Sequence, residues 1–178
     1  MGLTKPTLPS GTTAADLLLS ALLESMPGDK AYIGAGSYSA GDISTKYADQ
    51  TVMLAELSAN LTDLGELAEK PTKADSKQDK LKTRNYALPG KRTTTMELSL
   101  AGLSNLKKDF LESTGFVGQE ITIVLVSRTN DRVVIYNGMR WTVDWSGETD
   151  GLFSVVLSTE FSGATSGRVY VLKVAPAA

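Results

Sequence analysis

The sequence predicts a mainly β protein with some α-helix: an antiparallel β-sandwich or half-barrel with one flanking helix, plus an N-terminal helix. Three observations lead to this fold class. From residue 120 onward, short runs rich in β-branched and aromatic residues alternate with turn signals. An amphipathic helical pattern at residues 104–114 precedes these runs, and a Leu-rich helical pattern at residues 12–26 lies far ahead of them. We therefore expect a helical arm over residues 1–29 and one β domain over residues 30–178.

The first expected helix, residues 12–26, carries its own boundary signals. Thr12 or Thr13 can cap it, Asp16 suits its first turn, and Pro27-Gly28 ends it. Leucines cover so much of its surface that the helix needs a packing partner. That partner is either the core of its own chain or a neighbouring chain.

The next part of the chain gives mixed signals. Residues 30–42 begin as a short strand and continue as a loop rich in Gly and Ser. In residues 51–68, leucines recur at helical spacing, but Asn60, Thr62 and Asp63 are poor helix formers. A helix and a pair of short strands joined near Asn60 are therefore both open for this segment.

Positive charge gathers in residues 70–92. This segment holds eight of the 18 Lys and Arg residues and two Asp, so its charge is about +6, whereas the remainder of the chain is about −8. A polar segment without periodicity is most simply a solvated loop. It is also a candidate nucleic-acid patch, although Tyr86 is its only aromatic residue and single-strand binders stack several bases on aromatic rings. In a third interpretation the loop docks on an acidic surface of another subunit, through Lys73, Lys77, Lys80, Lys82, Arg84, Lys91 and Arg92.

A strand and a helix follow the basic segment. Residues 93–100 alternate between two faces, which predicts a strand with one buried face, made of Thr94, Met96, Leu98 and Leu100. Ser104 can cap the helix at residues 104–114, and Gly115 ends it. We expect its buried stripe to consist of Leu103, Leu106, Phe110 and Leu111.

The C-terminal third predicts a β-meander. A strand from residue 120 meets a turn at 129–131, and the next strand meets Asn137-Gly138, which is a strong hairpin signal. Residues 139–146 alternate, with Met139, Trp141, Val143 and Trp145 on one side and Arg140, Thr142, Asp144 and Ser146 on the other. We interpret Trp141 and Trp145 as core or interface anchors.

Catalytic and metal-binding chemistry is poorly represented in the chain. It has neither Cys nor His, which excludes disulfides, thiolate nucleophiles and Cys or His metal ligands, and removes the usual side chain for proton transfer near neutral pH. Asp144, Glu148, Asp150 and Glu160 lie on the predicted meander, where paired acids can perform acid–base chemistry or bind a hard cation. Their spacing is not that of an EF-hand loop. Solvent-facing positions of a sheet and a shared negative surface are the other interpretations. We expect no catalytic residue, no cofactor and no metal site.

The order of these elements resembles a known family. A long polar loop feeds the strand in "LPGKRTTTMELSLAGL", the helix "NLKKDFLEST" follows, and the meander contains "GMRWTVDWSGETDGLFSVVLSTEFSG". Over Ala31–Val174 this order is similar to that of the tail tube (major tail) proteins of long-tailed bacteriophages and related injection machines. The resemblance also favours strands for residues 51–68.

The resemblance implies a non-enzymatic virion protein of the tail, made in the host cytoplasm. Such subunits close their sheets into rings of six copies, and the rings stack into a tube, so the partners are other copies, other tail proteins and duplex DNA passing through the lumen without tight binding. No membrane partner is expected, since no apolar run approaches the ~20 residues that span a bilayer. The basic loop of residues 70–92 would reach a neighbouring subunit, and the lumen wall would carry the acids of the meander.

Three rival functions remain open. The first is a tail-completion or head–tail connector protein. The second is a nucleic-acid-binding β-barrel module that uses residues 70–92. The third is a small enzyme or carbohydrate-binding module that uses the meander acids and Trp141.

Overall fold

The computed structural model describes residues 30–82, 87–101, 105–113, 116–146, 154–163 and 167–177. The expected helix at residues 12–26, the loop residue Arg84 and the candidate acids Glu148 and Asp150 lie outside these ranges. The elements in chain order are β1 (Lys30–Ala35), α2 (Ala40–Lys46), α3 (Gln50–Asn60), β2 (Thr62–Lys82), β3 (Ala87–Ala101), α4 (Asn105–Leu111), β4 (Ile121–Val126), β5 (Arg132–Met139), β6 (Thr142–Ser146), β7 (Ser154–Ser162) and β8 (Val169–Lys173).

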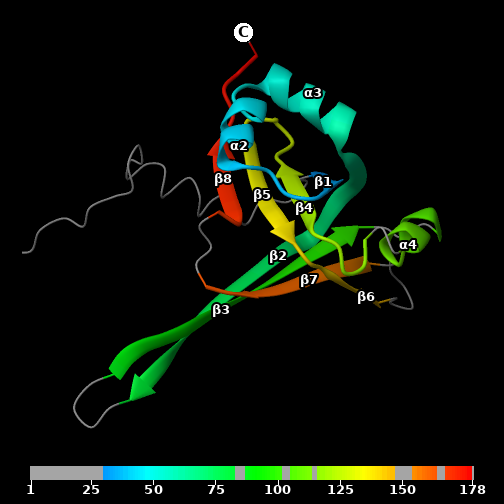
Figure 1. Cartoon of the computed structure of the whole chain (residues 1–178). Helices are drawn as coiled ribbons and strands as arrows, with labels where there is room; N and C mark the ends of the chain where they lie inside the picture. The colour runs from blue at the N-terminus through cyan, green and yellow to red at the C-terminus, as the bar shows by residue number, and fades with distance from the viewer. Residues whose placement is uncertain are drawn as a thin grey trace, which may run out of the picture.

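The strands form one antiparallel sheet, which confirms a mainly β fold with some α. In the described residues the sheet has eight strands in the order β6-β7-β3-β2-β1-β4-β5-β8. It bends along β2, whose first residues pair with β1 and whose residues from Leu67 onward pair with β3. The two halves cross each other in the manner of a half-barrel (Figure 1).

The main core lies between the two halves of the bent sheet. Buried side chains reach it from both halves, among them Ile33, Ile123 and Tyr136 from one and Leu98 and Leu157 from the other. The alternation expected at residues 93–100 is confirmed, because Thr94, Met96, Leu98 and Leu100 are all buried. This burial of one face leaves the opposite face of β3 outside.

Two helices cover the outer face of the half of the sheet that contains β4, β5 and β8. Helix α2 begins with a capping box between Ser39 and Asp42, and Asp49 caps α3 by accepting a hydrogen bond from the Val52 amide. Side chains of both helices join a second core with strands β4, β5 and β8. The expectation of a loop after residue 35 and of a single flanking helix therefore missed α2 and α3.

Residues 51–68 are a helix followed by a strand. Strands were favoured for this segment, and that is wrong up to Asn60, where α3 ends, and right from Thr62, where β2 begins. Of the three poor helix formers named above, Asn60 is the last residue of the helix and Thr62 and Asp63 follow it, so they mark its boundary. Gly65, with a φ of 91°, lies at a register shift in the pairing of β1 with β2.

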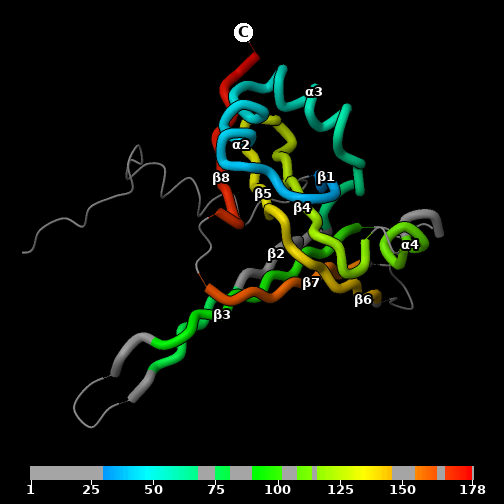
Figure 2. The backbone as a smooth tube through the Cα atoms, viewed as in Figure 1, coloured from blue at the N-terminus to red at the C-terminus, as the bar shows by residue number. Residues whose placement is uncertain are grey.

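Most of the basic segment at residues 70–92 is strand where a loop was expected. Strands β2 and β3 pair from Thr72–Leu98 out to Lys82–Ala87, with a register shift between Gln78 and Lys80. The hairpin that they form projects well beyond the body of the molecule (Figures 1 and 2). The described side chains at residues 75–80 are all exposed, so polar and apolar residues do not alternate in this part of the hairpin.

Asn137-Gly138 is a bulge within β5 and forms no hairpin turn. Ile121 of β4 pairs with Met139 and Ile123 pairs with Tyr136, so Asn137 and Gly138 together lie opposite Thr122. Gly138 has a φ of 58°. A positive φ is needed both in a bulge of this kind and in a tight hairpin turn. The sequence signal for left-handed backbone was therefore correct, and its structural interpretation was wrong.

Helix α4 buries Leu111, as expected, but leaves Phe110 partly exposed. Phe110 is 39% exposed, whereas Leu111 and Phe116 are fully buried in the main core. The rings of Phe110 and Phe116 meet edge to face with their centroids 6.4 Å apart. Phe116 therefore takes the core position that Phe110 was expected to fill.

Candidate channel face and projecting hairpin

The outer face of strands β6, β7 and β3 is the surface on which the described candidate acids lie. Because side chains alternate along a strand, the residues between the buried ones point away from the core. On β3 these are Thr93, Thr95, Glu97 and Ser99, on β7 they are Val156, Ser158 and Glu160, and on β6 they are Thr142 and Asp144. We call these nine residues the channel face. Eight of them are hydroxyl or carboxylate residues.

The register spreads the acids over this face. Ser158 lies between Thr142 and Glu97, while Asp144 is opposite Val156 and Glu160 is opposite Thr95. Asp144 and Glu160 are thus about four residues apart along the strand direction, or roughly 13 Å. Carboxylates at this separation do not share a proton or a metal ion.

Two further observations agree with that spacing. In the described part of the chain, no three acidic side chains gather closely enough to hold a metal ion. Asp144 and Glu160 are both exposed to solvent. The described part of the channel face is therefore suited to repelling anions weakly over a wide area.

The two tryptophans have different roles. Trp141 is buried, its Nε1 donates to the Ile121 carbonyl at 3.4 Å, and its ring meets Tyr136 edge to face. Trp145 is 42% exposed and lies under the Lys108 ammonium, which is 4.3 Å from the ring centroid. Since Trp141 points into the core, Asp144 lies on the opposite, outer face of β6, as the alternation requires.

The hairpin carries most of the basic residues named from the sequence. Lys77, Lys80, Lys91 and Arg92 are exposed, and Lys77 forms a surface ion pair with Asp75 at 3.3 Å. Such exposed pairs contribute little to stability. For Lys73 and Lys82 the backbone register alone is described: Lys73 lies opposite Glu97 and Lys82 opposite Ala87.

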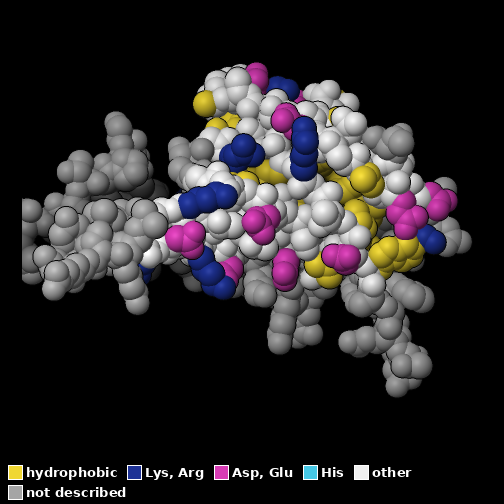
Figure 3. Space-filling view, turned by 60° about the horizontal axis from the view of Figure 1, so that its bottom comes forward, with side chains coloured by type: hydrophobic (Ala, Val, Ile, Leu, Met, Phe, Trp, Pro, Cys, Tyr) yellow, Lys and Arg dark blue, Asp and Glu magenta, His cyan; other side chains and the backbone are white. Residues whose placement is uncertain are grey.

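Acidic and basic side chains are unevenly distributed over the molecule. Figure 3 brings the bottom of Figure 1 forward and shows acidic side chains spread across a mostly polar surface, with most of the basic side chains towards one side and a further one among acids at the opposite end. Lys77 lies opposite Thr93, a residue of the channel face, so the bases of β2 border that face.

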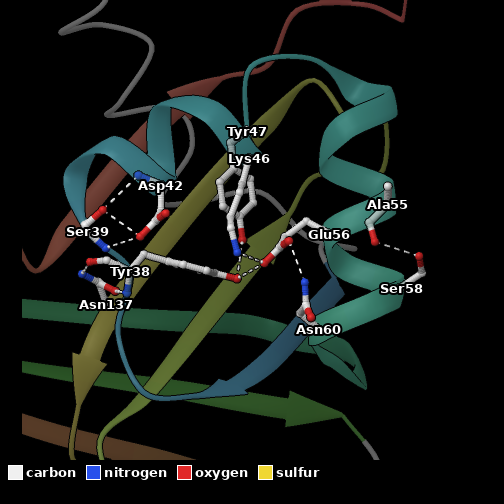
Figure 4. Close-up of polar contacts among 10 residues, drawn as sticks. All are labelled: Tyr38, Ser39, Asp42, Lys46, Tyr47, Ala55, Glu56, Ser58, Asn60 and Asn137. Carbon is white, nitrogen blue, oxygen red and sulfur yellow. Dashed lines mark hydrogen bonds and ion pairs between the residues drawn. The ribbon is translucent and has the colours of Figure 1, made fainter.

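A second polar cluster, not anticipated from the sequence, joins α2 and α3 (Figure 4). The buried Glu56 carboxylate accepts hydrogen bonds from Lys46 Nζ at 2.8 Å, Asn60 Nδ2 at 2.8 Å and the Tyr38 hydroxyl at 2.9 Å. Burial raises the pKa of this carboxyl, but the three donors outweigh burial and hold the pKa below its usual range. Glu56 therefore stays ionised near neutral pH.

The same cluster keeps two tyrosines protonated. Burial raises the pKa of Tyr38 above its ordinary value and that of Tyr47 to about 12. Tyr38 also exchanges backbone hydrogen bonds with the Asn137 side chain, which fixes the loop before α2 to the bulge in β5. A cavity of about 290 Å³ adjoins the cluster, lined by Gly34, Ala35, Gly36, Ser37, Tyr38, Lys46, Glu56, Asn60 and Thr122. Because every donor around Glu56 is engaged within the protein, we interpret the cluster as a structural latch.

Helices that could cross a membrane are not found: none in the described part of the chain combines the necessary length and apolarity.

Comparison with solved structures gives a distant likeness. A chain in the solved structure "Virion of native gene transfer agent (GTA) particle" is similar to this protein with a TM-score of 0.39 and 12% sequence identity, over 63% of this chain and 88% of that chain. No protein-family model matches the sequence, and no curated protein matches it either.

Proposed function

We propose that this protein is a structural subunit of a virion tail, which assembles into stacked rings around a channel for DNA. The channel face carries this proposal. It is a wide, outward-facing sheet surface composed of hydroxyls and spaced carboxylates, and it lies beside a hairpin suited to bridging subunits. The protein would act without a cofactor and without catalysis.

The physical requirement of a conduit explains the composition of this face. A channel must hold the charge of DNA without gripping it, and each phosphate that a Lys or Arg neutralises adds sequence-independent affinity. The hydroxyls of this face and the carboxylates of Asp144 and Glu160 offer no such neutralisation. The ring would place β6, β7 and β3 towards its axis, and sixfold closure is what the family resemblance alone implies.

The hairpin supplies the second part of the proposal. A two-stranded ribbon is at best marginally stable in water on its own. The hairpin of β2 and β3 projects past the core with both of its faces exposed, so contact with a neighbouring copy would stabilise it. Lys73, Lys77, Lys80, Lys82, Arg84, Lys91 and Arg92 would meet the acidic remainder of that copy.

Electron microscopy of the purified protein tests the assembly. We expect rings or tubes at high protein concentration, with the channel face lining the lumen. A protein that stays monomeric in light scattering at every concentration and salt tested would rule the proposal out.

The DNA-conduit role has its own test in assembled material. Asp144→Lys/Glu160→Lys should still form tubes, yet these tubes should retain duplex DNA, and the retention should fall steeply with added salt. The matched control is Asp144→Asn/Glu160→Gln, which removes charge without adding bases and should retain much less DNA. Equal DNA retention by unsubstituted, Lys-substituted and amide-substituted tubes would contradict a charge-controlled channel.

A nucleic-acid-binding module is the second candidate, and the exposed Lys77, Lys80, Lys91 and Arg92 on the hairpin favour it. Two-stranded β-ribbons can enter a groove of DNA. In that case the monomer would bind duplex DNA, and Lys80→Glu/Lys91→Glu would abolish the binding. A tail protein would instead leave DNA unbound as a monomer.

A further inference from the structure

An exposed apolar surface lies at the end of the molecule where α4 meets β6. It contains Phe110, Val117 and Trp145, which are 39%, 55% and 42% exposed and are three of the five large apolar side chains well exposed in the described residues. They belong to one region, because Lys108 of α4 lies over the Trp145 ring and Phe110 contacts Phe116, the neighbour of Val117. We call residues 108–112, 116–120 and Trp145 the α4 corner. Exposed patches that contain aromatic residues are typical of protein interfaces.

The α4 corner also carries three acids that form no ion pair with the part of the chain that the structure describes. Asp109, Glu112 and Glu120 are exposed, and no described Lys or Arg lies within ion-pairing distance of them. In Figure 3, apolar and acidic side chains lie beside one another at the end of the molecule where Figure 1 places α4. A partner for this surface should therefore combine apolar and basic groups.

An open sheet edge of the described residues adjoins the corner. Strand β6 is the last strand at its end of the described sheet and pairs with β7 alone. An unpaired edge offers backbone donors and acceptors to an incoming strand.

The far end of the hairpin has the required chemistry. Its exposed bases include Lys80 and Lys91, and its sequence near the turn contains the apolar residues Leu81, Tyr86 and Leu88. The hairpin projects from the side of the body opposite to α4 (Figure 1). It therefore cannot cover the α4 corner of its own subunit, and it is well placed to reach the corner of another.

We propose that the α4 corner is the docking site for the hairpin tip of a second copy of this chain. The inference rests on the proposed assembly and names the surface that receives the hairpin. The hairpin bases meet Asp109, Glu112 and Glu120, while the apolar residues near the turn cover Phe110, Val117 and Trp145.

Charge reversal on each side of the contact provides the test. The corner variant is Asp109→Lys/Glu112→Lys, and the hairpin variant is Lys80→Glu/Lys91→Glu. Each variant alone sets like charges against each other. Each should therefore raise the concentration at which half of the protein is assembled at least about tenfold, because like-charge contacts cost several kcal/mol and 1.4 kcal/mol corresponds to a factor of ten.

Mixing the two variants should restore assembly. In the mixture, the basic corner of one variant faces the acidic hairpin of the other, and the remaining corner and hairpin are also complementary. Sedimentation velocity and electron microscopy would therefore detect rings or tubes in the equimolar mixture and not in either solution alone. Glu66→Lys, which reverses an exposed acid on β2 outside the corner, is the control and should assemble as the unsubstituted protein does.

Each other outcome overturns a defined part of the proposal. If the corner variant assembles like the unsubstituted protein, the α4 corner is not the docking site, and the proposed function stands. If both variants fail and the mixture also fails, the corner and the hairpin do not contact each other. If the unsubstituted protein forms no assembly at any concentration, the docking site and the proposed function both fall.

Discussion

At the scale of single residues, the type of a residue does not determine whether its side chain is buried. Phe110 and Phe116 are both aromatic and lie six residues apart in the sequence, yet Phe116 is fully buried and Phe110 is 39% exposed. Helical periodicity favoured Phe110, because a pattern within one helix carries no information about the turn that follows. Glu56 is a further example: its partners Lys46, Tyr38 and Asn60 become neighbours only when α2 packs near α3.

Substituting the two phenylalanines separates their roles. Phe116→Ala removes a fully buried ring and should lower the free energy of unfolding by about 3–5 kcal/mol. Phe110→Ala removes a partly exposed ring with one edge-to-face contact and should cost about 0.5–1.5 kcal/mol. Urea unfolding followed by circular dichroism measures both. A larger loss for Phe110 than for Phe116 would mean that α4 packs through its other side.

The Glu56 latch predicts a defined pH dependence. The pKa of Glu56 is lowered in the folded protein, so its contribution to stability is present above the unfolded pKa, about 4.3 for a free Glu, and is lost as the pH falls through the folded value. Glu56→Gln should therefore be less stable than the unsubstituted protein at pH 7, and the difference should shrink by pH 3. Asp42 and Asp131, whose pKa values are also lowered, titrate equally in both proteins and cancel in the comparison. A difference that stays constant with pH would exclude an ionised Glu56 in the latch.

At the scale of elements, the sequence correctly predicted strands that bury one face and expose the other. Residues 93–100 alternate because one face of β3 is packed and the other is wet, and this period is visible in the residues themselves. The hairpin beyond the core has both faces in solvent, so residues 70–82 of β2 and the start of β3 looked like a loop. Asn137-Gly138 was misread because a hairpin turn and a bulge make the same demand on φ.

The channel face was accessible to prediction only in part. Alternation placed Asp144 opposite Trp141, and the structure has the same arrangement. That Glu97 and Glu160 come to lie on one surface with Asp144 follows from the pairing of β3 with β7 and of β7 with β6. Such pairings join residues distant in the sequence and are not encoded in local periodicity. Likewise, no local pattern connects α4 with Trp145.

The bulge in β5 can be tested by giving Gly138 a side chain. A Cβ there would lie 2.6 Å from Ser37 Cβ, and the φ of 58° is already unfavourable for a residue with a side chain. Gly36→Ala is the matched control, since Gly36 has a φ of 88° and no atom within 4 Å of the added Cβ. Gly36→Ala should cost only the backbone strain of about 1–2 kcal/mol, and Gly138→Ala should cost clearly more.

A double variant isolates the steric part of that loss. Ser37→Gly removes the atom that the new Cβ would meet, so Gly138→Ala/Ser37→Gly should regain stability relative to Gly138→Ala after the effect of Ser37→Gly alone is subtracted. Strictly additive losses in thermal or urea unfolding would show that Ser37 is not the obstacle.

For the whole molecule, the bent sheet divides the surface into regions with different properties. One half of the sheet is covered by α2 and α3, and the other half presents the polar channel face to solvent (Figure 1). The hairpin continues β2 and β3 of that second half beyond the core, so the channel face and the hairpin share strand β3. A contact made by the hairpin would therefore act on a strand that also forms the wall of the proposed channel.

Hydrogen exchange can detect this coupling. In the monomer, the hairpin amides at residues 75–80 and 91–93 have no apolar core behind them, and their ladder should open at a small free-energy cost. Docking on a second copy would bury the ribbon and slow exchange at these amides by at least about tenfold, which corresponds to 1.4 kcal/mol of added local stability. Strand β4, which is buried on both faces in the monomer, should exchange equally slowly in both states and provides the internal reference. Equal hairpin protection in monomer and assembly would mean that the ribbon stays in solvent and that subunits associate through other surfaces.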